Sequence, residues 1–312
     1  MLLALLLVNG QSSQLQKRGV VMCAGGGPPF HFALHAATAT AKLLRHEFEL
    51  TWPVELYFAK AEASEAERIA PGLLSNWTAA MQQQGLDASA RVLKSPPLLG
   101  ESRKQHERGR PYSCKAAAVL ETGLSEVVFL DSDVALLRSP LALFDSPEYV
   151  RTGALFFHDR QLDWAHPSAD GSAVCQDAKC VEAWLKSKIA HPSEALKQSN
   201  IWRGSSTMRV ESGIIAIDKE RHSRTLATLE KDYKEYVKVS HGEKEAWWIA
   251  AELTGTPYAL SPFAMGQMQA GNLSGPCCGL TVHFDPADGE PLAIHGIKRE
   301  VHRDLERLNP FD

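Results

Sequence analysis

The sequence predicts an α/β fold with a mostly parallel mixed sheet flanked by helices, in a single large domain. Over the first half of the chain, short apolar runs typical of buried strands alternate with helical stretches, and this alternation is the pattern of a parallel sheet. The chain has 312 residues, enough to bury a substantial core. One apolar run, 127–130, ends directly in two carboxylates, and ligands of open α/β sheets lie outside the carboxyl ends of strands.

The expected elements follow from apolar periodicity and from Gly and Pro at the boundaries. Strands are expected at 19–24, 53–58, 91–93, 127–130, 154–157, 211–218 and 293–298. Helices are expected at 30–47, at 61–86 with a turn near Pro71-Gly72, and at 112–121, 141–144, 219–236 and 243–254. Residues 158–204 show little periodicity. A loop of that length is uncommon in a compact domain unless it has a function, so this segment is predicted to be an insertion or lid.

Composition and charge limit the classes of function. Hydrophobic residues make up 44% and charged residues 22% of the chain, which is ordinary for a soluble globular protein. The net charge of -4 offers no general attraction to nucleic-acid phosphates, so nucleic acid is not an expected partner. Any phosphate must therefore be held by a local group of residues.

Residues 1–18 are interpreted separately from 19–312. Met1 to Val8 form an apolar stretch, but it is too short for the roughly 20 residues that a membrane-spanning helix needs. It is interpreted as a signal-peptide core or as the cut end of a longer anchor. An anchor of this kind is the only membrane contact that the sequence predicts.

Sequons and cysteines indicate a secretory compartment. N-x-[ST] triplets begin at Asn76 and Asn272, and the six cysteines are an even number compatible with disulfides. Cys175 and Cys180 are the expected pair, because both lie in one polar loop. A zinc site is the alternative use of cysteine, but no C-x-x-C spacing supports it.

The carboxylates after the 127–130 run are Asp131 and Asp133. Strand alternation places both on one side, within reach of a single divalent cation and the phosphates it carries. Aspartate oxygens are hard ligands that suit Mn²⁺ or Mg²⁺ better than Zn²⁺. The alternative is a strand end capped by polar residues, and the buried run before the pair favours the metal site.

Four local patterns resemble a nucleotide-sugar-dependent glycosyltransferase of the GT-A fold, and more closely the Golgi α-mannosyltransferases first known from fungi. They occur in the family's order between residues 19 and 298. They are Val20–Gly26 followed by Pro53-Val54-Glu55, Lys115–Ala118 ahead of Leu130–Asp133, Glu211-Ser212-Gly213 leading to Ile217–Lys219, and Gly242–Trp248. The resemblance implies a GT-A catalytic domain over 19–312, with 158–204 on the acceptor side.

The resemblance implies a metal ion, Mn²⁺ or Mg²⁺, bound with a nucleotide-sugar donor, GDP-mannose. Asp133 is expected to bind the metal directly, Asp131 to bind the metal or the ribose, and His295 to complete the site. His283 competes with His295 for that role, since its local sequence is similar. The residues expected to contact the donor are Ala24, Gly25, Gly26, Lys115, Asp131, Ser212 and Lys298, the lysines through its diphosphate.

Glu211 and Glu243 are the carboxylates expected to face the sugar and to act in catalysis, by accepting hydrogen bonds or by stabilising positive charge in the transition state. Helix capping is the alternative role of Glu243. The resemblance implies transfer with retention of configuration, to a glycan or glycoprotein acceptor in the Golgi. Two departures leave donor and acceptor open: the family usually has aspartate at position 243, and 295–298 matches loosely.

Two other functions are compatible with the same residues. One is a transferase of this fold that uses a UDP-sugar, because the loops that recognise the base are not apparent in the sequence. The other is a glycan-binding or scaffold protein that kept the fold and lost catalysis. The residues that argue against the second are Asp131, Asp133, Lys115, Glu211 and Glu243.

Overall fold

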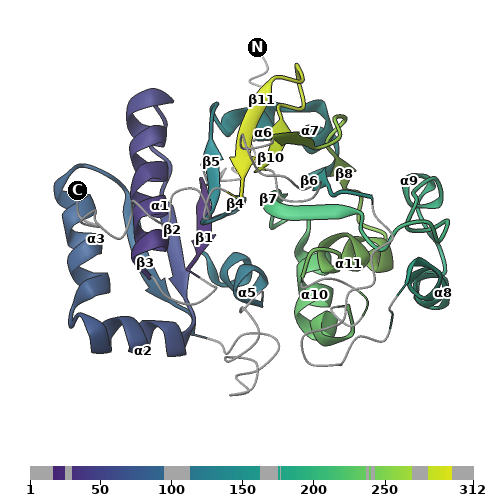
Figure 1. Ribbon diagram of the computed structural model, residues 1–312, viewed down its shortest axis with the longest axis horizontal. Coiled ribbons are helices and arrows are strands. Elements are labelled where there is room, and N and C mark those ends of the chain that lie inside the picture. The colour runs from purple at the N-terminus through teal and green to yellow at the C-terminus, as the bar shows by residue number, and fades with distance from the viewer. Residues whose placement is uncertain are drawn as a thin grey trace, which may run out of the picture.

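Two β-sheets organise the part of the chain that the structure, a computed structural model, describes: residues 17–24, 30–94, 113–161, 175, 177–236, 239, 243–268 and 280–296 (Figure 1). The larger sheet has the strand order β3-β2-β1-β4-β7-β6-β8. The strands are β1 (Arg18–Cys23), β2 (Val54–Phe58), β3 (Ala88–Val92), β4 (Glu126–Asp131), β6 (Ala154–His158), β7 (Val210–Asp218) and β8 (Ala259–Leu260). Only β7 runs antiparallel to its neighbours, β4 and β6. The predicted α/β class with a mostly parallel mixed sheet is therefore confirmed.

The smaller sheet is antiparallel and was largely missed. Its strand order is β5-β11-β10-β9, formed by β5 (Val134–Leu136), β11 (Pro291–His295), β10 (Leu280–Phe284) and β9 (Gly266–Met268). Only the last strand, expected at 293–298, was predicted. These strands have three to five residues, and so short a run carries almost no periodicity of its own.

Helices cover both faces of the larger sheet (Figure 1). One face packs against α1 (Phe30–Lys42) and α3 (Leu73–Gln83), and the other against α5 (Ser113–Glu121), α10 (Ser223–Tyr236) and α11 (Ala246–Thr254). The remaining helices are η1 (Leu43–Glu47), α2 (Lys60–Ile69), α6 (Leu141–Asp145), α7 (Pro147–Thr152), α8 (Ala178–Lys188) and α9 (Glu194–Lys197). None of the helices in the described ranges is both long and apolar enough to cross a membrane.

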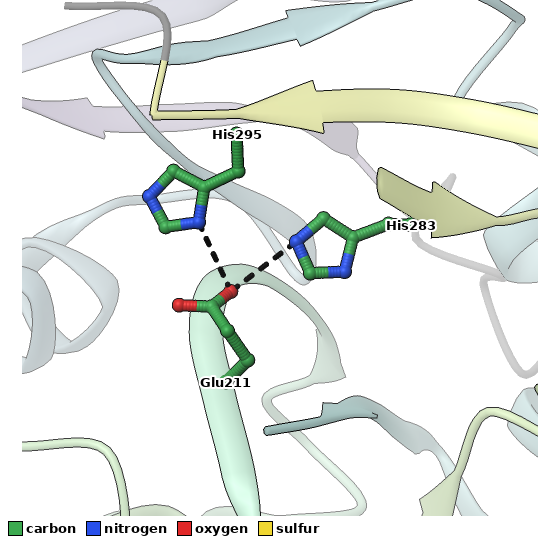
Figure 2. Close-up of side chains that lie close together, drawn as sticks. All are labelled: Glu211, His283 and His295. Carbon is green, nitrogen blue, oxygen red and sulfur yellow. Dashed lines mark ion pairs between the residues drawn. The ribbon is translucent and has the colours of Figure 1, made fainter. Parts of the chain in front are cut away.

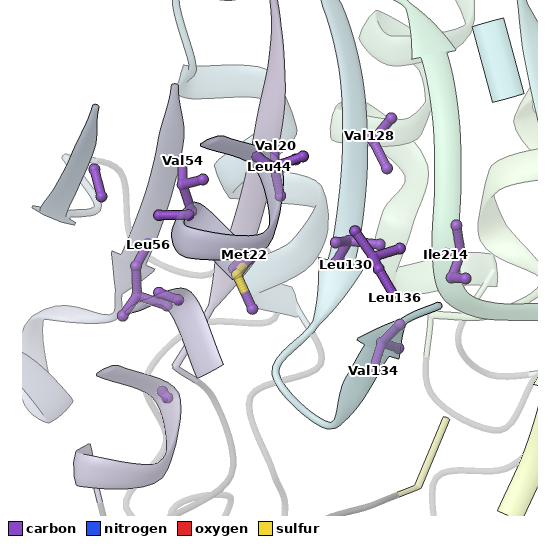
Figure 3. Packing of buried hydrophobic residues seen from close by; sticks show 14 of the residues in the cluster. Val20, Met22, Leu44, Val54, Leu56, Val128, Leu130, Val134, Leu136 and Ile214 are labelled. Carbon is purple, nitrogen blue, oxygen red and sulfur yellow. The ribbon is translucent and has the colours of Figure 1, made fainter. Parts of the chain in front are cut away.

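Strand alternation divides the apolar residues between two cores. Val128 and Leu130 of β4 belong to the core on the α1 face, which Figure 3 shows. Val127 and Phe129 belong to the core on the α5 face. Because side chains alternate along a strand, Asp131 continues the second series and its carboxylate is directed towards α5.

Several predicted boundaries need correction. The helical segment expected at 61–86 consists of α2 and α3 and ends at Gln83. The turn expected near Pro71-Gly72 separates the two helices, and the φ of Gly72, +77°, is left-handed. Strand β3 begins at Ala88, earlier than the predicted 91–93. The segment 158–204, predicted to lack regular structure, contains α8 and α9. Strand β1 begins at Arg18 and ends at Cys23, one residue earlier at each end than the predicted strand 19–24.

Two disulfides lie in the described part of the chain. Cys175–Cys180 is the predicted pair and is confirmed. Cys23–Cys114 was not predicted, since the two residues are 91 positions apart. It joins the end of β1 to the first turn of α5, directly before Lys115. Cys277 and Cys278 lie outside the described residues.

We predict that mass spectrometry of the unreduced protein, expressed through an oxidising compartment, finds both crosslinks. Cys23→Ala with Cys114→Ala should then destabilise the fold more than Cys175→Ala with Cys180→Ala, because the first bridge closes a separation of 91 residues and the second one of 5. Chain entropy gives upper estimates of about 4–5 and about 2 kcal/mol. Free thiols at Cys23 and Cys114, or equal losses in denaturant unfolding, would contradict this.

Candidate active site

The two predicted aspartates lie at the carboxyl end of β4. Asp131 is the last residue of the strand, and Asp133 follows in the turn before β5. Their side chains retain 20% and 27% of their exposure, so a small ligand can reach both carboxylates. The position matches the expectation for an open α/β sheet.

His295 joins the aspartates through the smaller sheet. In the pairing of β11 with β5, His295 lies opposite Val134, and the amide of Gly296 donates to the carbonyl of Asp133 at 3.0 Å. As a result, His295 Nε2 lies 3.3 Å from Asp133 Oδ1 and 3.7 Å from Asp131 Oδ2. The structure thus brings together the three residues that were predicted to bind metal.

Lys115 projects from α5 into a buried group of acceptors. Its Nζ lies 2.7 Å from Asp131 Oδ2 and 2.7 Å from Glu243 Oε1, and it donates to Ser212 Oγ at 3.2 Å. The Ser212 hydroxyl in turn donates to Glu243 Oε1 at 2.8 Å. Protein groups therefore surround the ammonium, and the Glu243 side chain has no exposed surface.

Glu211 forms a second group with two histidines, as Figure 2 shows. The same carboxylate oxygen, Oε2, lies 3.3 Å from His283 Nε2 and 3.3 Å from His295 Nδ1. The amide of Gly213 donates to this oxygen at 2.7 Å. Both histidines that the sequence offered as alternatives are thus in the site, but only His295 is within reach of the aspartates.

Asp159 and Lys244 were not predicted to belong to the site. Lys244 Nζ lies 3.0 Å from Asp159 Oδ2 and 3.9 Å from Glu211 Oε1. Lys244 directly follows Glu243, and that proximity was the one available signal. Asp159 is the second residue of the 158–204 segment, so this ion pair connects the start of the segment to the site.

Burial and neighbouring charge shift the protonation of the site. Burial raises the pKa of Asp131 to about 6, although Lys115 and His295 lower it. Burial disfavours charge on Lys115, but Asp131 and Glu243 outweigh it and raise its pKa. For His295, burial is outweighed by Glu211 and Asp133, which raise its pKa well above the ordinary value. The carboxylates thus stabilise the charged forms of Lys115 and His295.

Most of the loop that was predicted to contact the nucleotide lies outside the described residues. Ala24 is buried after the end of β1, where its amide donates to the carbonyl of Tyr57 at 2.9 Å. Gly25, Gly26 and Lys298 lie outside the described residues. Their expected contacts with the donor stay predictions.

The mixed sheet flanked by helices, with an ionic site at the carboxyl end of β4, agrees with the GT-A fold that the sequence predicted. Residues 17–273 match the model of a family described as "Mannosyltransferase putative". The chain belongs to this mannosyltransferase family.

Individual relatives match parts of the chain. It is 25% identical over 202 residues to alpha-1,3-mannosyltransferase MNN1 of Saccharomyces cerevisiae, covering 57% of this chain and 26% of that protein. Alpha-1,3-mannosyltransferase MNT2 of the same yeast is 21% identical over 211 residues, which are 62% of this chain and 38% of the relative. The chain thus spans well under half the length of these relatives.

Among solved structures, core-mannan synthase A (CmsA/Ktr4) from Aspergillus fumigatus, in its Mn/GDP form, is 10% identical and has a TM-score of 0.45. The match covers 78% of this chain and 72% of that one.

We predict that Lys115→Met destabilises the protein by about 3–5 kcal/mol, because removing one partner of a buried ion pair leaves uncompensated charge. Here the charges left are Asp131 and the fully buried Glu243. Denaturant unfolding measures the loss. Lys186→Met is the control: its ion pair with Glu182 is exposed, so the midpoint should hardly move. A stable Lys115→Met variant would indicate a lysine that acts only on a ligand.

Proposed function

We propose that this chain is a metal-dependent glycosyltransferase that moves mannose from GDP-mannose to a glycan or glycoprotein acceptor, with retention of configuration. Family membership supports the transfer of mannose, since the related yeast proteins are named mannosyltransferases. The observation that carries the proposal is the convergence of Asp131, Asp133 and His295 at the carboxyl edge of the sheet.

These three residues fit a divalent ion of the Mn²⁺ type. One ligand atom from each lies within 4.8 Å of the others, and the set consists of two hard oxygens and one imidazole nitrogen. The charge balance supports the same assignment. Four carboxylates converge, those of Asp131, Asp133, Glu211 and Glu243. Lys115 pairs with two of them, Asp131 and Glu243, and Lys244 is paired mainly with Asp159.

The chain's own residues prepare the site for a diphosphate. When bound, a divalent ion supplies the positive charge that neutralises the leaving diphosphate as the bond to the sugar breaks. Asp131 and Asp133 hold that position, and Lys115 keeps Asp131 in place from behind. Glu243 acts through Lys115, because its contacts are with Lys115 and Ser212.

The sugar-facing roles of Glu211 and Glu243 stay predictions. Both side chains are at least 95% buried and contact basic groups of the protein. A direct contact with the donor would require Glu243 to leave Lys115. A change in turnover after substitution of Glu243 would therefore reflect the lost contact with Lys115 as well as any lost contact with the sugar.

The segment 158–204 supports our proposal for the acceptor side, and the cysteines support our proposal for the compartment. The Asp159–Lys244 ion pair connects the start of this segment with the site, which supports its proposed role in holding the acceptor. Two disulfides in the described residues support an oxidising compartment of the secretory pathway, and we propose that it is the Golgi. The predicted anchor within 1–18 lies almost wholly outside the described residues.

We predict that GDP-mannose with Mn²⁺ raises the unfolding temperature of the full chain more than UDP- or CMP-sugars do. A ligand that binds only the native state stabilises it by about 2.7 kcal/mol at a concentration of 100 times its Kd. A larger shift with a UDP-sugar would select the alternative donor. No shift with any donor, with or without Mn²⁺, would favour the glycan-binding or scaffold protein.

We further predict that Asp133→Asn abolishes Mn²⁺-dependent donor hydrolysis while unfolding remains cooperative. The asparagine side chain lacks the negative charge that holds the ion. The Asp133 side chain is partly exposed and contributes little to the core. Asp288→Asn is the matched control, because Asp288 is an exposed aspartate paired with Arg138 and remote from the site residues in its contacts. Unchanged hydrolysis in Asp133→Asn would remove Asp133 from the metal site.

A further inference from the structure

The Glu211 carboxylate is built into the protein and is not open to a ligand. Its side chain is 5% exposed and that of His283 is fully buried. The His283 ring packs edge-on against Phe157, with ring centroids 4.8 Å apart. A carboxylate buried in this way acts on a bound substrate through another residue. Within the described part of the chain, Glu211 forms ion pairs with Lys244, His283 and His295. Of these three, His295 also lies beside the aspartates.

His295 uses its two ring nitrogens in opposite directions. Nδ1 lies 3.3 Å from Glu211 Oε2, and Nε2 lies 3.3 Å from Asp133 Oδ1. A histidine that binds a metal through one nitrogen usually donates the other N–H to a carboxylate or carbonyl, which fixes its tautomer and ring orientation. Glu211 occupies that second position.

Gly213 makes this arrangement possible. Its amide fixes Glu211 Oε2 at 2.7 Å. A Cβ at this position would lie 2.6 Å from both Nδ1 and Cε1 of His295, which is closer than real Cβ contacts allow. The glycine therefore both orients the carboxylate and leaves the space in which the imidazole lies against β7.

We propose that Glu211 is a positioning residue for the metal site. Its carboxylate accepts the Nδ1 proton of His295 and so leaves the Nε2 lone pair directed between Asp131 and Asp133. His283 and the Gly213 amide hold the carboxylate in place. This inference rests on the proposed function, because it assigns Glu211 its role through the ion.

A second ion between Glu211, His283 and His295 is the competing interpretation, since their ligand atoms also lie within 4.8 Å of one another. Two observations favour positioning. Glu211 Oε2 already accepts the Gly213 amide, and His283 is fully buried, whereas both aspartates of the other group are partly exposed. The number of ions that the wild-type chain binds distinguishes a positioning role of Glu211 from a second ion site.

The test measures Mn²⁺ binding in the absence of nucleotide, by titration calorimetry and by the electron paramagnetic resonance signal of free Mn²⁺. The wild-type chain should bind one ion. Glu211→Gln should still bind one ion, about 10–100-fold more weakly, which is the usual cost of losing an outer partner of a metal-binding histidine. Glu126→Gln is the matched control: this glutamate is buried at the opposite end of β4 and paired with Arg18 at 2.7 Å, so its Mn²⁺ affinity should equal that of the wild type.

Gly213→Ala provides a second variant that changes no charge. The added methyl group should displace His295 and weaken Mn²⁺ binding in the same range, while thermal unfolding shows a folded protein. Long-range ¹⁵N spectra of the Zn²⁺-loaded wild type should show the His295 proton on Nδ1. If Glu211 had only a structural role, Glu211→Gln would bind Mn²⁺ with wild-type affinity, and nothing would require the His295 proton to be on Nδ1.

Three results would overturn the inference. Wild-type affinity in both Glu211→Gln and Gly213→Ala would show that His295 needs no positioning. Two ions in the wild type, with one lost in Glu211→Gln, would establish a second ion site instead. Absence of Mn²⁺ binding in the wild type would reject the proposed function itself, and that result is visible before any variant is compared.

Discussion

The buried ammonium of Lys115 is the interaction on which the site depends. It joins α5, the end of β4, the start of β7 and the turn before α11 through Asp131, Ser212 and Glu243. Carboxylates brought this close repel one another strongly where water is scarce, and a shared cation offsets that repulsion. The Cys23–Cys114 disulfide fixes the helix turn that carries the lysine to β1. The ammonium and the disulfide thus set the position of Asp131 from one side.

The smaller sheet sets the position of the site from the other side. Pairing of β11 with β5 places His295 beside Asp133, and β10 carries His283 against Glu211. His295 therefore lies between the Glu211 carboxylate on one side and the two aspartates on the other. The acidic end of β4 has a lysine on one flank and an imidazole on the other. This group is the one that we propose as the divalent-ion site.

Much of the site could be predicted because its residues follow recognisable local patterns. Asp131 and Asp133 end a buried strand, and Lys115, Glu211 and Glu243 lie in short patterns shared with a known family. Their partners could not be predicted. Glu243 was expected to face a sugar or to cap a helix, and the structure pairs it with Lys115. The Cys23–Cys114 bridge was missed for the same reason, since no local pattern relates residues 91 positions apart.

The sequence by itself determined the alternation of strands and helices, the acidic end of β4 and the parity that directs Asp131 towards α5. These properties are local: they depend on apolar periodicity and on the side-chain period of a strand. Only the tertiary structure decided that His295 completes the group and that His283 does not reach the aspartates. That choice depends on the register between β11 and β5, and register is set by long-range pairing and packing between segments that a local pattern cannot relate.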